Sequence, residues 1–408
     1  MQLIRSAAVA GALAAATLVP AARPAAAAES SAAEEQWSGQ IVSTRSRWTG
    51  DRRAIVTESV LRTPSGRQVT LRQLGGSVDG IGMVVLHSQP VLRAGDRVTA
   101  RVALARDLRG RVSRTVRALH AEAPGPGGAA MPFVRTEATE TRVPLAWRSG
   151  CAQIYFHEDG TSHIDGSLEF EEMERVLIRW RYEVQGCSYF DLRYMGVDDG
   201  DVGLDGKNMV IFREGEWCRP ASDDDPGECY DAAAAGLTTL FFIDDPASKR
   251  NGTLLDADIE LNAVTFSLAV DHQSTTPGNC ESDLANTFTH EIGHLMGLDH
   301  TCWTGAGVRL NDHQGEPLPL CALDPNLPNG VRDATMFNFQ DCGETKKSSP
   351  EPDDADGVCE IYPLEDNPRE CLAAELEPGN GCSLSGSRSG ASAGLVALAL
   401  LLARRRRR

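Results

Sequence analysis

The chain shows two kinds of hydrophobic pattern, one on each side of a Pro/Gly/Ala-rich stretch at 121–140. From Trp37 to about His120, short segments alternate apolar and polar residues, and turn residues such as Gly75-Gly76 separate them. Alternation with period two and no long helical repeat predicts a small all-β domain over 29–120, either a barrel or a sandwich. The predicted strands read IVSTRSRW, AIVTESVL, RQVTLRQL, IGMVVLH, DRVTARVAL and RVSRTVRAL.

The pattern changes after the predicted linker at 121–140. A strand at 152–157 precedes a segment with helical spacing, and short apolar runs follow at NMVIF, TTLFFI and DADIELN. These elements predict an α+β domain with a twisted mixed sheet over 141–365. The residues with helical spacing are Leu168, Met173, Val176, Leu177, Trp180 and Val184.

Length and charge narrow the class of protein. With 408 residues the chain is long enough for two domains, each with its own core. Its formal net charge of -17 would repel phosphate groups, and there is no basic stripe outside the extreme C-terminus. We therefore expect no nucleic-acid partner.

The first 28 residues predict export. Arg5 gives a positive start, an Ala/Leu/Val-rich stretch follows, and the small residues Ala26-Ala27-Ala28 suit cleavage by a signal peptidase. The alternative is a membrane anchor, but Pro20 and Arg23 interrupt the apolar stretch before it reaches spanning length. We interpret 1–28 as a signal peptide.

The cysteines agree with export. All 11 lie between Cys151 and Cys382, which predicts a disulfide-bonded domain in an oxidising compartment. Zinc-thiolate binding is disfavoured because no CxxC pair occurs. Sequence proximity suggests three pairs: Cys218 with Cys229, Cys302 with Cys321, and Cys342 with Cys359. The odd count leaves one cysteine over, for which Cys382 is the best candidate.

The segment HEIGHLMGLDH carries the strongest chemical signal. On a helix His290 and His294 lie one turn apart on one face, so both imidazoles can reach one ion, with Glu291 beside them. Gly297 can end the helix and turn the chain, which would bring back His300 as third ligand. Three protein ligands leave one position for water, the arrangement of a catalytic zinc site.

The alternative is a chance HExxH match on an ordinary amphipathic helix. At 100° per residue the apolar positions of the helix lie opposite the two histidines, so one face can pack into a core while the other lines a cleft. This arrangement, the glycine and the third histidine favour a zinc site. The apolar residues are Leu284, Ala285, Phe288, Ile292, Leu295 and Met296.

HEIGHLMGLDH followed by Thr301 resembles the extended zinc motif of the metzincin metallopeptidases, closest to their matrixin branch. The resemblance implies a methionine turn beneath the metal, which Met336 in DATMF would supply. The stretch SPEPDDADGVCEIYPL resembles the matrixin C-terminal helix. Astacin-like and serralysin-like relatives carry a tyrosine two residues after the methionine, but this chain has Asn338 there, so we expect no tyrosine ligand.

The resemblance also implies where substrate and calcium would bind. Residues 238–243 would form the edge of the sheet, and an exposed edge binds extended peptides through their main chains. The acidic stretch 198–206, with Asp256 and Asp258, could hold calcium as matrixin-like domains often do. Neither cluster follows the EF-hand spacing, and the simpler interpretation is solvated turns.

The C-terminus has three parts: a spacer at 366–390 that contains Gly381-Cys382-Ser383, an apolar run from Ala391 to Ala403, and five arginines, Arg404 to Arg408. This arrangement is similar to the C-terminal sorting signals of myxobacterial surface proteins. The resemblance implies processing near Cys382, removal of 391–408, and attachment to the cell envelope of a Gram-negative bacterium. The alternative is a tail helix or a disordered end.

The N-terminal domain shows no catalytic constellation. His87 and His120 lie far apart without obvious partners, and we interpret each as an ordinary surface or core histidine. The matrixin cysteine switch cannot operate from residues 1–150 because no cysteine occurs there. Inhibition by steric cover or by another ligand remains open, as does binding to substrate or to the envelope.

Together these features predict an exported zinc metalloendopeptidase at the cell surface or outside the cell. It would hold one zinc and act on protein or peptide substrates, with Glu291 as general base. Two alternatives stay open. One is a non-enzymatic surface adhesin that uses the domain as a scaffold, and the other is a zinc hydrolase of non-peptide amides or esters.

Overall fold

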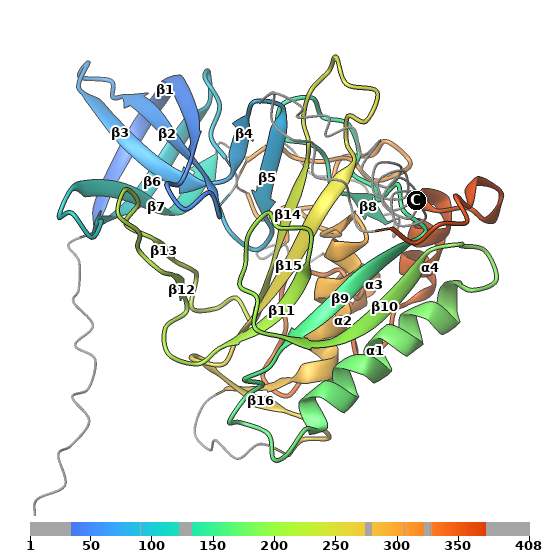
Figure 1. The fold of residues 1–408 in the computed structure, drawn as a ribbon. Helices are drawn as coiled ribbons and strands as arrows, with labels where there is room; N and C mark the ends of the chain where they lie inside the picture. The colour runs from blue at the N-terminus through green and yellow to red at the C-terminus, as the bar shows by residue number, and fades with distance from the viewer. Residues whose placement is uncertain are drawn as a thin grey trace, which may run out of the picture.

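The computed structural model describes residues 34–89, 91–121, 133–273, 280–305, 307–321, 327 and 329–372. The predicted signal peptide, residues 122–132 of the predicted linker, Cys382 and the C-terminal tail lie outside the described residues. Within them the chain is a mixed α+β structure, rich in strands, with few helices and several sheets (Figure 1). No described helix is long and apolar enough to cross a membrane.

Five N-terminal strands close into a barrel, drawn in blue to blue-green in Figure 1. They are β1 (Glu35–Trp48), β2 (Ile55–Arg62), β3 (Gln68–Leu74), β6 (Arg97–Arg106) and β7 (Val112–Ala121), in the order β1-β2-β3-β7-β6. Inward positions of their alternating pattern, with Leu92 from the segment before β6, form the core. All six predicted strands are present, and five of them belong to the barrel. The core residues are Ile41, Leu61, Val69, Leu71, Leu92, Val98, Ala100, Val102 and Val116.

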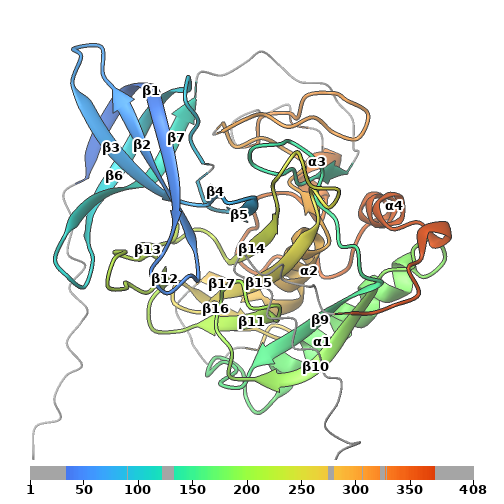
Figure 2. The ribbon, with the colours of Figure 1, turned by 45° about the horizontal axis from the view of Figure 1, so that its top comes forward.

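The sixth predicted strand, IGMVVLH, leaves the barrel. Gly75 and Gly76 turn the chain with φ of 97° and 123°, values that favour glycine. The hairpin of β4 (Gly76–Val78) and β5 (Ile81–Val85) then joins the sheet of the second half of the chain. Figure 2 shows this hairpin between the barrel and strand β14.

The second half is built on a mixed sheet whose order is β10-β9-β11-β15-β14-β5-β4. Its own strands are β9 (Cys151–His157), β10 (Asp191–Asp198), β11 (Asn208–Arg213), β14 (Gly236–Ile243) and β15 (Leu254–Asn262). The first four in the sheet are parallel and β14 is antiparallel to β15. The strands predicted at 152–157, NMVIF, TTLFFI and DADIELN are all present. The prediction that residues 238–243 form the edge of the sheet is wrong, because β14 lies between β15 and β5.

Helices α1 (Leu168–Val184) and α2 (Leu284–Leu295) pack against each other beside the sheet. They form the largest apolar core with the sheet, and Trp180 at its centre donates a hydrogen bond from Nε1 to the Thr289 carbonyl at 3.1 Å. The predicted C-terminal helix is α4 (Pro352–Ile361), which contacts α1. The remaining short helices are α3 (Asn329–Asp333) and η1 (Leu364–Asp366).

Three pairs of short strands connect these elements. They are β8 (Val134–Arg135) with β18 (Leu298–Asp299), β12 (Cys218–Arg219) with β13 (Glu228–Cys229), and β16 (Phe266–Ala269) with β17 (Cys280–Asp283). The first pair fixes the chain that follows α2, so residues 134–135 belong to the frame of the second half.

Five disulfides join ten of the 11 cysteines. The pairs Cys218–Cys229 and Cys302–Cys321 are as predicted. The prediction of Cys342 with Cys359 is wrong, because the fold brings Cys342 to Cys280 and Cys359 to Cys187. The fifth disulfide joins Cys151 to Cys371. So many disulfides indicate an exported or extracellular protein.

The barrel is anchored to the hairpin β12–β13 by a buried cluster of charges. Arg72 of β3 is only 2% exposed and donates to both carboxylate oxygens of Asp225, with Nε to Oδ2 at 3.0 Å. It also donates to Glu228 Oε2 at 2.9 Å. A guanidinium that is buried between two carboxylates attracts their charge and also forms hydrogen bonds of defined direction, so it fixes the position of the barrel against this hairpin.

Candidate metal centre

Helix α2 carries the first half of the predicted motif. Asp283 caps its N-terminus by accepting a hydrogen bond from the Asn286 amide at 2.8 Å, which satisfies a free N–H of the first turn. All 12 residues of the helix are buried. A Cβ added at Gly293 would lie 2.4 Å from Met336 Sδ, so the glycine lets Met336 pack directly against the helix. Met336 thus lies beneath the two histidines of the helix, as a methionine turn would.

The turn after α2 returns the third histidine. Gly297 has φ 97° and donates from its amide to the His294 carbonyl at 2.9 Å, which ends the helix. A side chain at Gly297 would also meet the Leu145 carbonyl at 2.9 Å. The turn places His300 Nε2 at 3.1 Å from His294 Nε2, as the sequence predicted.

A fourth histidine joins these three. His87 follows β5, and its Nε2 lies 2.9 Å from that of His290, 3.3 Å from that of His294 and 3.2 Å from that of His300. These four form the one group of potential metal ligands found among the described residues. Our interpretation of His87 as an ordinary histidine without partners is therefore wrong. Side-chain placement of His120, on β7, lies outside what the structure describes.

Hydrogen bonds at Nδ1 fix the orientation of the His290 and His294 rings. His290 Nδ1 lies 2.6 Å from the Thr335 carbonyl, and His294 Nδ1 lies 2.9 Å from the Leu298 carbonyl. A carbonyl only accepts, so Nδ1 carries the proton and Nε2 of a neutral ring does not. Carbonyl partners of this kind orient the histidines of metal sites.

Burial keeps all four rings neutral. It lowers the pKa of His294 to about 4 and the pKa values of His87, His290 and His300 well below their usual range. Neutral imidazole is the form that binds metals. Unprotonated nitrogens that face each other repel unless a cation lies between them, so the donor set fits a metal ion.

The distances between the ring nitrogens also fit a shared metal ion. For a metal–nitrogen bond of about 2.0–2.1 Å, as for zinc, tetrahedral ligands lie roughly 3.3–3.4 Å apart. Four of the six separations between ligand nitrogens run from 2.9 to 3.3 Å, and all six lie within 4.8 Å. The four nitrogens are therefore close enough to share one metal ion.

Glu291 lies beside the histidines, as predicted. Its Oε2 accepts a hydrogen bond of 2.6 Å from the Thr238 hydroxyl, and its Oε1 lies 3.5 Å from His87 Nε2. Burial raises the pKa of Glu291 to about 8, and the hydroxyl of Thr238 opposes this effect. A buried carboxyl with a raised pKa beside potential metal ligands is typical of a site for proton transfer.

The helix face that we expected to line an open cleft is covered. Residues 84–89 run past the histidines, and the Asn338 side chain hydrogen-bonds to His87. A cleft of about 410 Å³ remains beside this segment, lined in part by His300, Trp303, Leu318 and Phe339. Asn338 thus occupies the position expected for a tyrosine in some relatives, and it contacts the fourth histidine.

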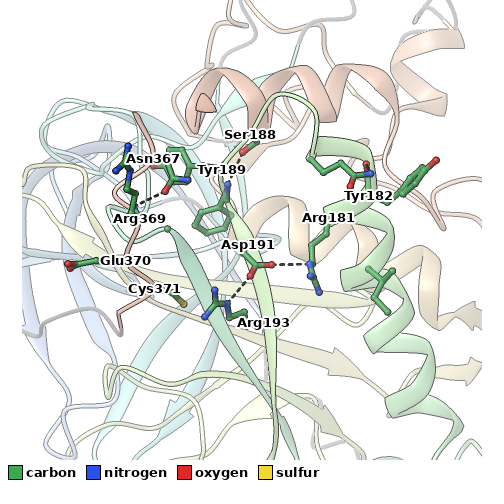
Figure 3. A pocket seen from close by; sticks show the side chains of 14 residues that line it. Arg181, Tyr182, Ser188, Tyr189, Asp191, Arg193, Asn367, Arg369, Glu370 and Cys371 are labelled. Atoms are coloured by element: carbon green, nitrogen blue, oxygen red, sulfur yellow. Dashed lines mark hydrogen bonds and ion pairs between the residues drawn. The ribbon is translucent and has the colours of Figure 1, made fainter. Parts of the chain in front are cut away.

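A larger hollow, of about 710 Å³, lies at the C-terminal end of α1 (Figure 3). Its charged groups pair with each other: Asp191 accepts from Arg181 at 2.9 Å and from Arg193 at 2.8 Å. Since this open surface brings no nucleophile or ligand cluster together, the histidine cluster is the better candidate site.

The acidic stretch considered for calcium forms a loop against β15. Asp258 accepts from the Gly203 and Met209 amides at 2.9 Å each, and Asp256 Oδ2 accepts from those of Asp205 and Gly206. Burial raises the pKa values of Asp256, to about 8, and of Asp258. The interpretation as solvated turns is wrong for Asp256 and Asp258, because both are fully buried on β15. They hold the loop through backbone amides, and the alternative of a calcium site is not tested by these contacts.

Comparison with known protein families finds no family model that matches the chain, and comparison with curated proteins finds no match either. The assignment of function below therefore depends on the site itself and on the motif resemblance.

Proposed function

We propose that this protein is an exported zinc-dependent metalloendopeptidase of the metzincin type. The observation that carries the proposal is the convergence of the Nε2 atoms of His290, His294 and His300 beside the buried carboxyl of Glu291. Four neutral imidazoles suit zinc among the common metals, although they would also bind copper or nickel.

Each histidine has a definite part in holding the ion. His290 and His294 project from one helix, and their Nδ1 atoms are fixed by backbone carbonyls, so both rings are oriented before metal arrives. His300 comes from the turn after Gly297. A zinc ion held by these residues supplies Lewis-acid polarisation of the scissile carbonyl and of the attacking water.

Glu291 performs the proton transfer. Its carboxylate accepts a proton from the attacking water and passes it to the nitrogen of the leaving amine, while Thr238 holds the second oxygen in place. Burial alone favours the protonated form, but a cation held by the histidines favours the carboxylate that a base requires. Strand β14 would align the substrate once β5, which pairs with it in the structure, has left, because its main chain could then pair with an extended peptide.

The C-terminal sorting tail and the attachment to the envelope through Cys382 belong to the same proposal, and they depend on the sequence resemblance alone. The two rivals are a non-enzymatic adhesin and a hydrolase of non-peptide amides or esters. Intact Glu291 disfavours the adhesin, since a scaffold needs no buried carboxyl beside its metal ligands.

The test compares His87→Ala with His87→Ala/Glu291→Ala, so that the fourth histidine does not cover the other three. Both proteins should bind one zinc per chain, and on a mixed peptide library read by mass spectrometry the second should cleave about 10²–10⁴-fold more slowly. His294→Ala in the same background should lose the metal.

Equal cleavage by the two forms would overturn the role of Glu291. Absence of cleavage by the zinc-loaded protein, both as His87→Ala and with Gly82→Val added to displace β5 from β14, would overturn the peptidase itself. The same protein is then assayed on ester and non-peptide amide substrates, and turnover there would establish the hydrolase rival.

A further inference from the structure

Residues 81–88 make two contacts with the candidate site that the proposed reaction does not use. The first is a strand pairing. β5 runs antiparallel to β14, with Ile81 opposite Ile243 and Val85 opposite Thr239, and the Leu86 amide continues the ladder by donating to the Thr238 carbonyl at 2.9 Å. Without the β4–β5 hairpin, β14 would be the last strand of the sheet.

The second contact is His87. Its backbone has φ 64°, a left-handed conformation that is uncommon for a bulky residue. In this conformation Nε2 lies within 3.3 Å of the Nε2 atoms of His290, His294 and His300. The same nitrogen lies 3.5 Å from Glu291 Oε1, the group that would otherwise face the attacking water.

We propose that residues 81–88 are a built-in, substrate-like inhibitor, in which β5 occupies the peptide-binding edge of β14 and His87 occupies the fourth ligand position. This inference deepens the proposed function and rests on it. Four protein ligands make a closed site, whereas a hydrolytic zinc site needs one position for water. The chain as folded is therefore latent.

The inhibitor is held by packing as well as by the metal ligands. Met83 and Val85 are buried in a cluster with Leu237, Phe241 and Trp217. A Cβ added at Gly82 would lie 2.2 Å from the Phe242 ring, so the glycine allows β5 to lie close against β14. Activation thus requires the whole strand to leave the sheet, or another segment to replace it.

The inhibitor also indicates how a substrate would lie. An activated enzyme would bind a peptide antiparallel to β14, with residues in the places of Val84, Val85 and Leu86 on the N-terminal side of the reacting bond. Because Val85 lies in an apolar cluster, an aliphatic side chain at the corresponding substrate position should be preferred.

The first test counts metal ligands directly in the zinc-loaded full chain by X-ray absorption. The native protein should show four nitrogen ligands, and His87→Ala three nitrogens and one oxygen. The matched control is His272→Ala, which removes an exposed histidine that also has a left-handed backbone, with φ 59°. It should keep four nitrogens.

The second readout is binding of acetohydroxamate, a small chelating ligand, to the same three proteins. If the native segment leaves the site about 1% of the time, His87→Ala should bind acetohydroxamate on the order of 100-fold more tightly. Cleavage of the peptide library should rise in parallel. His272→Ala should behave like the native protein.

The outcomes separate this inference from the proposed function. Three nitrogens in the native protein, or equal acetohydroxamate affinity in all three proteins, would overturn the inhibitor and leave the peptidase standing. A ligand change without any cleavage, also after Gly82→Val has been added to displace β5, would support occupation of the fourth position and overturn the peptidase. Loss of zinc from His87→Ala would also overturn the inference, because His87 would then be a structural ligand.

A variant away from the metal tests the strand. Gly82→Val adds atoms where Phe242 lies and should displace β5, so acetohydroxamate affinity should rise at least about tenfold while all four histidines remain. Faster amide hydrogen exchange at 81–88 would verify the displacement. Displacement with unchanged acetohydroxamate affinity would overturn the inhibitory role of the strand.

Discussion

The N-terminal part contacts the second half of the chain through two clusters whose chemistry differs. In one, Arg72 is buried against Asp225 and Glu228, which carry the opposite charge. In the other, His87 meets three neutral histidines, which attract one another only through a shared cation. The ionic cluster needs no metal to hold the barrel in place, whereas the histidines attract one another only while a metal is bound. A protein with both contacts can release its inhibitory segment without losing the barrel.

The largest expected effect comes from breaking the ionic cluster. Arg72→Ala removes the cation that the two buried carboxylates share: Asp225 keeps Arg219, but Glu228 loses its side-chain partner. The loss should lower the free energy of unfolding by about 3–5 kcal/mol, measured by urea denaturation. The control is Arg109→Ala, which removes an exposed pair with Asp223 between the same two regions and should change the stability far less. Equal losses of stability in Arg72→Ala and Arg109→Ala would contradict the distinction between the buried cluster and the exposed pair.

Metal removal should have the next largest effect, and it should be local. When zinc is present at about 100–1000 times its Kd, chelation should cost roughly 3–4 kcal/mol of stability. Amide hydrogen exchange should accelerate at residues 81–88, while the barrel strands and the Arg72 contact stay protected. Adding zinc back should restore protection, and uniform acceleration over the whole chain would contradict this prediction.

Acid should have the smallest effect of the three. Burial lowers the pKa of His294 to about 4, so the unfolded or opened form, with a value near 6.5, binds the proton more tightly. The contribution of neutral His294 to the free energy of unfolding is complete above about pH 6.5 and is lost as the pH falls from there toward 4. At pH 5.5 the loss of stability from this group should be about 1 kcal/mol. In the chelated protein, amide hydrogen exchange at 81–88 should rise further over this window, whereas Arg72 stays charged throughout. Acceleration only outside this window would contradict the prediction.

The sequence predicted the parts of this molecule that depend on local spacing. The helix with His290 and His294, the glycine turn to His300, and five barrel strands all follow from short-range periodicity and turn chemistry. A one-turn separation on a helix fixes two side chains relative to each other before any tertiary structure forms. For the same reason the disulfide between Cys218 and Cys229 was predictable, since a short hairpin joins them.

Contacts between distant segments could not be predicted. His87 is 203 residues from His290 in the chain, and nothing in its neighbourhood marks it as a ligand. The only indication was a strand, IGMVVLH, that follows two glycines and ends in a histidine. Cys342 was assigned to a cysteine 17 residues away, although the fold pairs it with Cys280 across 62 residues. Such pairs are set by the packing of whole elements.

The β4–β5 hairpin lies between β3 and β6 of the barrel, so the chain holds it at both ends. A tethered ligand of this kind acts at an effective concentration on the order of millimolar. A free peptide must compete with that concentration to reach β14, and one cut in the tether leaves the other end attached. The barrel, which holds both ends of the hairpin, therefore sets the peptide concentration that is needed for turnover. A substrate that weakens the barrel would lower this concentration.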